Sequence, residues 1–302
     1  MTSFAQRIAF SAETAGWNAY QGLFRSMSLE RASDFGAALM RRIGPLASVQ
    51  HVARTNMKIA FPEASERELD RLLDAMWDNF GRLLGEFPNT HRFDFSEGSD
   101  QLEVEGIDIL REFDRAGQPA VLVGGHFANW ELMPAVIVRH MKDCRITYRH
   151  ANNPQIDRAI IAQRQAYGVN VFAPKGETGA KEIMKALKQG ASVALMNDQK
   201  MNDGIAAPFF GREAMTASGP ARMALRYNCP LVPMSIVRKD GCRFKITVFE
   251  PFEKPEGKDA AAILELVTKV NRFIEDQIRR APSQWFWVHR RFEKSLYRKD
   301  AG

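Results

Sequence analysis

Short apolar runs alternate with helical patterns from residue 103 onward, and this alternation restricts the fold more than any other feature of the chain. The apolar or β-branched runs occupy residues 120–123, 145–148, 169–172, 192–196, 231–237 and 243–249. Helical spacing of apolar residues fills most of the intervals, over 131–141, 154–167, 178–189 and 218–228, and a last helix is expected over 259–280. Strands that alternate with helices form crossover units in a buried sheet. The sequence therefore predicts an α/β fold with a largely parallel mixed sheet flanked by helices.

Residues 1–95 predict an N-terminal helical region. Ser65 and Glu68 form a capping box, and the apolar residues that follow repeat at helical spacing. "IGPL" at 43–46 ends an earlier helix, and residues 4–27 are weakly amphipathic. This first segment is either a helix packed on the core or a helix lying in a membrane interface. Because the chain contains no linker or repeat, we expect a single domain over 1–302, with the α/β core at 103–292.

The composition narrows the class of protein. Three cysteines without a CxxC pair argue against a disulfide framework and against a zinc site, so we expect no metal and no cofactor. No secretory signal is evident, and no window approaches the ~20 apolar residues of a membrane-spanning helix. The protein is expected to be soluble or to lie on a membrane. Its net charge of +6 favours an anionic partner: nucleic acid, phospholipid or an acidic carrier.

The segment "GGHFANWE", residues 124–131, combines a strand end with chemically active side chains. Functional groups gather where strands of such sheets end and helices begin. The two glycines place His126 ahead of the next helix, so that Glu131 in its first turn can reach back to the imidazole. A histidine held by a carboxylate acts as a general base. Alternatively, Asn129 caps the helix, Glu131 complements the helix dipole and His126 is an ordinary turn residue.

This segment contains no serine or cysteine to serve as a nucleophile. The predicted base would therefore act on a hydroxyl or amine that the substrate brings, and that group would attack an activated acyl donor directly.

"GGHFANWE" resembles the H-x4-D/E block of the glycerolipid acyltransferase superfamily. Three later stretches resemble its lipid A biosynthesis (late) acyltransferase branch. They are "YRHANNPQIDRAIIAQRQAYG" at 148–168, the segment 172–224, and "QWFWVHRRF" at 284–292. The resemblance covers about 103–292 in order. It implies a glycerol-3-phosphate-acyltransferase-like fold, with His126 and Glu131 as the catalytic pair.

The same resemblance and the strand-end positions suggest residues that bind substrate. They are Asn129, Arg149, Arg158, Arg164, Lys175, Asp198 and Gln199. Arginine and lysine suit phosphate groups on an acceptor or on a pantetheine arm, although solvated surface is the alternative for Arg158 and Arg164. Asp198 follows a buried run and either orients a basic residue or the acceptor, or only caps the next turn. Phe209 and Phe210 either line an acyl groove or belong to the core.

The resemblance implies a fatty acyl transfer from acyl carrier protein or acyl-CoA to a hydroxyl of a lipid A precursor, an anionic glycolipid. It also implies a location on the cytoplasmic face of the bacterial inner membrane, as a peripheral or monotopic protein. The aromatic and basic residues of "WFWVHRRFEKSLYRK" suit a headgroup interface. They would also suit single-stranded nucleic acid, but no nucleic-acid-binding motif accompanies them, and we expect none to bind. A lysophospholipid or aminolipid acceptor, or a non-catalytic lipid-binding protein, are the alternatives.

Overall fold

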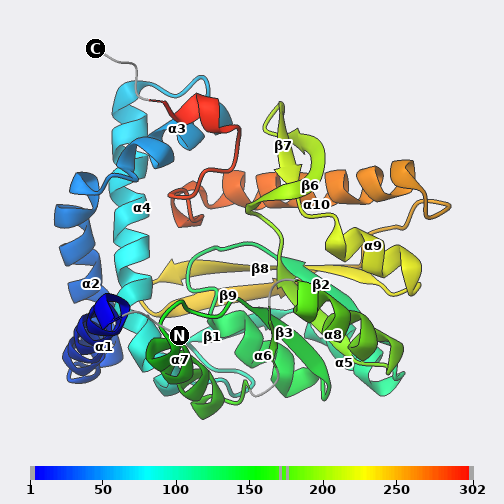
Figure 1. Cartoon of the computed structure of the whole chain (residues 1–302), viewed down its shortest axis with the longest axis horizontal. Helices are drawn as coiled ribbons and strands as arrows, with labels where there is room; N and C mark the ends of the chain where they lie inside the picture. Colours follow the sequence, from blue (N-terminus) through cyan, green and yellow to red (C-terminus); the bar gives the residue numbers. More distant parts are fainter. Residues whose placement is uncertain (1–3, 170–171, 175–176, 299–302) are drawn as a thin grey trace.

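The fold is organised around a seven-stranded sheet in the computed structural model, which describes residues 4–169, 172–174 and 177–298 (Figure 1). The strand order is β1-β9-β8-β2-β5-β3-β4. These strands are β1 (Leu102–Glu105), β2 (Val121–Gly124), β3 (Cys144–Tyr148), β4 (Phe172–Pro174), β5 (Ser192–Met196), β8 (Leu231–Asp240) and β9 (Arg243–Val248). Neighbouring strands run parallel except β8 and β9. The predicted α/β fold with a largely parallel mixed sheet is confirmed.

Helices cover both faces of this sheet. They are α5 (Ile107–Arg115), α6 (Leu132–His140), α7 (Pro154–Ala166), α8 (Glu177–Lys188), α9 (Gly219–Arg226) and α10 (Ala260–Arg280). Because side chains alternate along a strand, Leu122 and Ala194 pack with α5 and α6, whereas Val121 and Val193 pack with α8, α9 and α10. Figure 1 shows α5 and α6 below the sheet and α10 above it.

The predicted N-terminal helical region is also confirmed. It consists of α1 (Phe4–Arg25), α2 (Leu29–Ile43), α3 (Gln50–Ala60) and α4 (Glu66–Glu86), and Ser65 and Glu68 form the expected capping box. Helices α2 and α4 cross with their backbones nearly touching: a Cβ on Gly36 would lie 2.2 Å from the carbonyl oxygen of Gly81. This close crossing of α2 and α4 places the last turn of α4, which ends at Glu86, against buried residues of the sheet.

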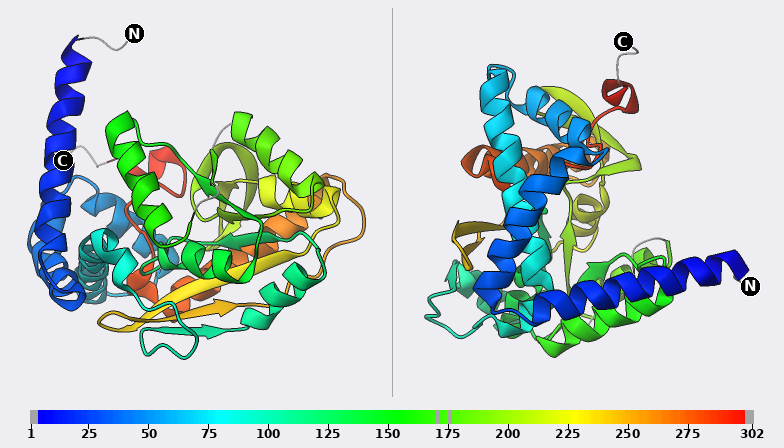
Figure 2. Two further views of the ribbon diagram at one scale, coloured as in Figure 1. Left: turned by 90° about the horizontal axis from the view of Figure 1, so that it is seen from below. Right: turned by 90° about the vertical axis from the view of Figure 1, so that its left-hand side faces the viewer.

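Helix α1 runs beside α7 at the edge of the molecule, where Asn153 Nδ2 donates to the carbonyl of Phe10 over 2.8 Å (Figure 2). Its second half is anchored: Phe24 is buried, and the Tyr20 hydroxyl donates to the carbonyl of Leu84 over 2.6 Å. Its first half is more open, and Ile8 is 56% exposed. Among the described residues, no helix has the length and apolar character needed to cross a membrane.

The predicted strands and helices lie where expected to within a few residues. Of the strand expected at 169–172, residues 170–171 lie outside the described part of the chain, and β4 is described from Phe172. The sequence did not reveal β1, α5 or the hairpin of β6 (Lys200–Phe209) and β7 (Arg212–Thr216). The headgroup interface predicted for the C-terminal aromatics is wrong for Trp285, Trp287 and Phe292, which are buried. They pack against other rings of the core, and Trp287 lies 5.9 Å from the ring of Phe61. Phe209 and Phe210 are likewise buried core residues.

Candidate active site

His126 and Asp198 form the central contact of the site. His126 Nδ1 lies 2.7 Å from Asp198 Oδ1, and the His126 backbone N–H donates to Asp198 Oδ2 over 2.9 Å. The carboxylate is fully buried, whereas the imidazole keeps 16% of its surface exposed. With Asp198 as its acceptor, Nδ1 carries the proton, so Nε2 presents the lone pair. The arrangement is that of a carboxylate-oriented general base.

The sheet register explains why these two residues meet. β2 and β5 are parallel neighbours, and Gly124 is paired with Met196. His126 and Asp198 each stand two residues beyond that pair, so parallel pairing delivers both side chains to the same edge. Gly125 is needed at this turn, because a Cβ there would lie 2.6 Å from the ring of Phe127.

A buried tryptophan completes the surroundings of Asp198. Trp285 Nε1 donates to Asp198 Oδ2 over 2.8 Å. Burial alone would raise the pKa of Asp198, but the adjacent imidazole of His126 outweighs it and holds that pKa well below its usual range. Asp198 therefore stays ionised and stabilises a positive charge on His126.

The predicted contact between Glu131 and His126 is wrong. Both Glu131 oxygens instead accept from Arg164 of α7, with Nη2 to Oε1 at 2.6 Å and Nε to Oε2 at 2.9 Å. The Tyr167 hydroxyl also donates to Oε2 over 3.2 Å. The reason lies in the turn at 126–131, where Ala128 adopts φ 44° and Glu131 takes the position before α6. Glu131 faces α7 from there, while the imidazole faces β5.

Arg164 is consequently a largely enclosed partner of a carboxylate, and the alternative of a solvated surface position is wrong for it. Its guanidinium lies 4.7 Å above the ring centre of Tyr148, and 16% of its side chain is exposed. Burial acts to lower the pKa of Arg164, but the charge of Glu131 outweighs it and raises that pKa above its ordinary value. This fork-to-fork pair fixes α7 against the start of α6.

A cavity of ≈ 290 Å³ is lined by this pair, by His126 and by residues of the sheet. His126, Glu131, Arg149, Arg164 and Gln199 contribute polar groups to its lining. The apolar lining includes Leu122, Met133, Ile137, Ile146, Ala194 and Met234. The cavity therefore lies between α6 and the face of the sheet that α6 covers, and we term the part lined by the polar residues around His126 its polar mouth. This lining suits a long apolar chain with a reactive end.

The loop that carries His126 is held by backbone contacts with the segment around Trp285. The N–H of Ala128 donates to the carbonyl of Gln284 over 2.8 Å, and the N–H of Phe286 donates to the carbonyl of His126 over 3.0 Å. A positive φ at a non-glycine residue such as Ala128 costs about 1–3 kcal/mol and persists only where its surroundings enforce it.

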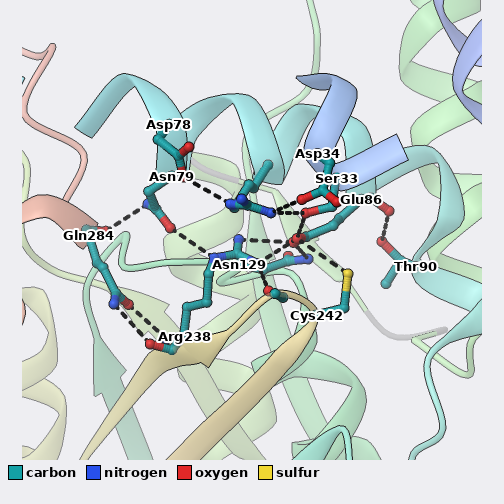
Figure 3. Close-up of polar contacts among 12 residues, drawn as sticks. Ser33, Asp34, Asp78, Asn79, Glu86, Thr90, Asn129, Arg238, Cys242 and Gln284 are labelled. Carbon is teal, nitrogen blue, oxygen red and sulfur yellow. Dashed lines mark hydrogen bonds and ion pairs between the residues drawn. The ribbon is translucent and has the colours of Figure 1, made fainter. Parts of the chain in front are cut away.

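Asn129, predicted to bind substrate, lies outside the cavity and is fully buried (Figure 3). Its Nδ2 donates to Glu86 Oε2 over 2.9 Å. Glu86 also pairs with Arg238 at 2.5 Å and accepts from Ser33 Oγ at 2.7 Å. The same buried network reaches Gln284, whose Oε1 accepts from the N–H of Arg238 over 2.7 Å. Asn129 thus links the His126 loop to α2, α4 and β8 rather than to substrate, and it does not cap α6.

The remaining predicted residues divide between the cavity and the surface. Arg149 and Gln199 line the cavity, and their binding of substrate stays a prediction. Arg158 is exposed on α7 and away from the cavity lining, in keeping with a solvated surface. Lys175 lies outside the described residues. Among the residues that the structure describes, no group of three or more His, Cys, Asp or Glu could hold a metal ion.

Sequence reasoning missed three contributors to this site. Trp285 bonds Asp198, Tyr167 bonds Glu131, and Glu86 anchors the loop through Asn129. Trp285 and Tyr167 lie within the stretches 284–292 and 148–168. These stretches carried the family resemblance, but they indicated no role for either residue. Glu86 stands at the end of an amphipathic helix and carried no signal.

A histidine oriented by a buried carboxylate, beside an apolar cavity on a largely parallel α/β sheet, suits an enzyme that acts on acyl chains. The chain belongs to the bacterial lipid A biosynthesis acyltransferase family, whose model matches residues 7–294. It is therefore an acyltransferase that transfers acyl groups to a lipid acceptor.

Named relatives include two enzymes of Escherichia coli K12. The lipid A biosynthesis palmitoleoyltransferase is 28% identical over 85% of this chain and 86% of its own length. The lipid A biosynthesis lauroyltransferase is 28% identical over 80% and 78%. The phosphatidylinositol mannoside acyltransferase of Mycobacterium tuberculosis is 25% identical over 91% and 85%. Among solved structures, the 1-acyl-sn-glycerophosphate acyltransferase PlsC of Thermotoga maritima matches with a TM-score of 0.36 and 13% identity, over 84% of this chain and 97% of that one.

Replacing Arg164 by alanine should destabilise the fold. The variant leaves the buried carboxylate of Glu131 without its cation, and breaking a buried pair costs about 3–5 kcal/mol. The free energy of unfolding, measured by urea titration, should fall by that order. Arg158→Ala on the same helix is the control and should change it little. Equal stabilities of the two variants would contradict the pairing of Arg164 with Glu131.

Proposed function

We propose that this acyltransferase moves a fatty acyl group from a thioester donor, acyl carrier protein or acyl-CoA, to a hydroxyl of a lipid A precursor, with His126 as general base. The observation that carries the proposal is the His126–Asp198 pair at the polar mouth of an apolar cavity. In this proposal Asp198, and not the predicted Glu131, is the carboxylate that orients His126 as the general base.

The proton path follows from the geometry of the imidazole. Asp198 holds Nδ1 as the donor, so Nε2 accepts the proton of the acceptor hydroxyl as its oxygen attacks the thioester carbonyl carbon. The C–S bond then breaks, and the imidazolium returns the proton to the departing thiolate. The products are an ester and a thiol, and His126 regains its starting state. The ionised Asp198 stabilises the imidazolium between the two transfers.

Glu131 and Arg164 have a different role in this proposal. Both line the cavity, and their two hydrogen bonds fix the mouth between α6 and α7. The pair holds the wall against which the donor and acceptor align, while His126 alone handles the proton. Arg149, which also lines the mouth, is available for a phosphate or carbonyl group.

The lipid A precursor is favoured as acceptor by the family match over residues 7–294. The mycobacterial relative, which is named for a phosphatidylinositol mannoside, supports a second glycolipid acceptor. Incubation with each lipid and a panel of acyl donors, followed by mass spectrometry, distinguishes them. Acylation of the mannoside alone would overturn the lipid A proposal.

The pairing of His126 with Asp198 predicts a specific pattern of kinetic coupling. His126→Ala should lower kcat by about 10²–10⁴, the usual loss for a general base. Asp198→Asn should also be slow, because it removes the charge that stabilises the imidazolium. Since the two residues act as one unit, the double variant should be no slower than His126→Ala alone.

Glu131→Gln supplies the matched control for that pattern. Combined with His126→Ala, it should lower kcat further, because its contribution is separate from the proton transfer. Single-turnover rates measure both combinations, and circular dichroism melts report folding. Additive losses for His126 and Asp198, with non-additive losses for His126 and Glu131, would instead restore the original pairing.

The cavity also predicts a change in acyl chain selection. Ala194 lines the cavity from the middle of the sheet, so Ala194→Phe should fill its inner part. The preferred donor should become shorter, because a chain that no longer fits forfeits the burial of about 0.8 kcal/mol per methylene. Relative kcat/KM across a series of acyl-CoA donors measures the shift. The control is Val193→Phe, which perturbs the opposite face; an identical shift there would argue against this cavity as the acyl site.

We further propose peripheral attachment to the cytoplasmic face of the bacterial inner membrane through α1. Support comes from the exposed Ile8 and Leu23 on this helix and from the net charge of +6. Ile8→Asp should reduce cosedimentation with phosphatidylglycerol vesicles. Leu46→Asp is the control, because Leu46 is 83% exposed but lies on another segment. Equal binding by wild type and Ile8→Asp would remove α1 from the proposal.

A further inference from the structure

A second hollow lies directly beside the reaction centre. It measures ≈ 280 Å³, and its polar lining consists of Gln199, Lys200, Asn202, His289, Arg290 and Lys294, which we term the cationic hollow. Gln199 lines both this hollow and the apolar cavity, so the two are adjacent. Asp198 precedes Gln199 in the chain, and its partner Trp285 lies 5.4 Å from the ring of His289.

The lining of the cationic hollow contains no carboxylate. Within the described part of the chain, Lys200, Arg290 and Lys294 have no ion-pair partner, and the hydrogen bond of Lys200 goes to a neutral carbonyl, that of Phe292, at 3.4 Å. Arg54, by contrast, is a surface base that pairs with a carboxylate, that of Glu66 at 2.7 Å. The three uncompensated cations therefore create a local positive potential.

Arg291, which lies between Arg290 and Phe292 of this lining in the chain, adds to the potential. Its side chain is fully buried, and the acceptors of its hydrogen bonds are neutral: the Met215 carbonyl at 3.1 Å, Thr216 Oγ1 at 2.7 Å and Asn271 Oδ1 at 3.2 Å. Burial lowers the pKa of Arg291 to about 10, so the guanidinium is still charged at neutral pH. A buried cation without a contacting carboxylate favours an anion nearby.

We propose that the cationic hollow binds a phosphate ester of one of the two substrates while the transferred acyl chain occupies the apolar cavity. The inference rests on the proposed function, because it assumes that the phosphate ester of a substrate and the transferred acyl chain bind on the two sides of Gln199. Two ligands share the required chemistry: the phosphopantetheine arm of the donor and the sugar phosphate of the glycolipid acceptor. Lysine, arginine and amide side chains supply the N–H donors that phosphate oxygens accept.

Two pairs of probes separate these sources. The first is S-dodecanoyl-4′-phosphopantetheine against S-dodecanoyl-pantetheine, and the second is a phosphorylated acylated glucosamine disaccharide against its dephosphorylated form. The test variant is Lys200→Gln/Arg290→Gln/Lys294→Gln. The control is Lys239→Gln/Arg243→Gln/Lys258→Gln, which removes the same charge from three exposed positions away from the hollow. Isothermal titration calorimetry measures each Kd.

The test variant should bind one phosphorylated probe at least about tenfold more weakly, because hydrogen bonds to charged groups are typically worth that factor each. The affected pair identifies the source of the phosphate. Unphosphorylated probes and the control variant should show wild-type Kd values. Lys294→Gln alone, at an exposed position, should weaken the same probe if the triple variant fails to fold.

Unchanged binding of both phosphorylated probes would overturn the proposal, and so would equal weakening by the control variant. Because Kd is measured without turnover, this result is independent of acyl transfer. Phosphate-dependent binding without acylation of a lipid A precursor would sustain the cationic hollow and contradict the proposed acceptor.

Discussion

The buried carboxylate of Asp198 joins three parts of the molecule that the rest of the site depends on. It accepts from the backbone and ring of His126 after β2, it follows β5, and it accepts from Trp285 of the C-terminal segment. A buried charge is stable only when its oxygens are satisfied. The buried carboxylate therefore depends on all of these hydrogen bonds, and together they fix the orientation of the imidazole.

The two acidic residues of the site are separated by their environments. Asp198 faces an imidazole and an indole, whereas Glu131 faces a guanidinium and a phenol. The Arg164–Glu131 pair makes two hydrogen bonds between α7 and the start of α6, so it is suited to hold the two helices together. Asp198 faces the imidazole that takes the proton, so it is suited to orient that ring and to stabilise its charged form. Because their partners differ, Glu131 fixes the wall of the cavity, whereas Asp198 fixes the general base.

The helical region supports this site from behind. Glu86 at the end of α4 is fully buried and binds Arg238 of β8 and Asn129 of the catalytic loop. The close crossing of α2 and α4 brings Ser33 to the same carboxylate. Removing any single partner would leave a buried charge unsatisfied, so the network joins the stability of the N-terminal helices to the geometry of the His126 loop.

Local pattern determined much of this protein. Periodicity located most strands and helices, Ser65 and Glu68 marked the start of α4, and the two glycines before His126 marked a strand end. These features depend on residues near in sequence, so they can be recognised there. The amino-acid sequence also resembles a family of acyltransferases, and this resemblance indicated the class of reaction.

Only the tertiary structure decided which carboxylate serves His126. Glu131 lies five residues away in the chain and Asp198 seventy-two, but β2 and β5 are neighbours in the sheet although β3 and β4 come between them in sequence. Strand order results from the packing of the whole core, so no local window contains it. For the same reason, the burial of Arg164, Trp285 and Glu86 could not be predicted, since each is enclosed by segments distant in the chain.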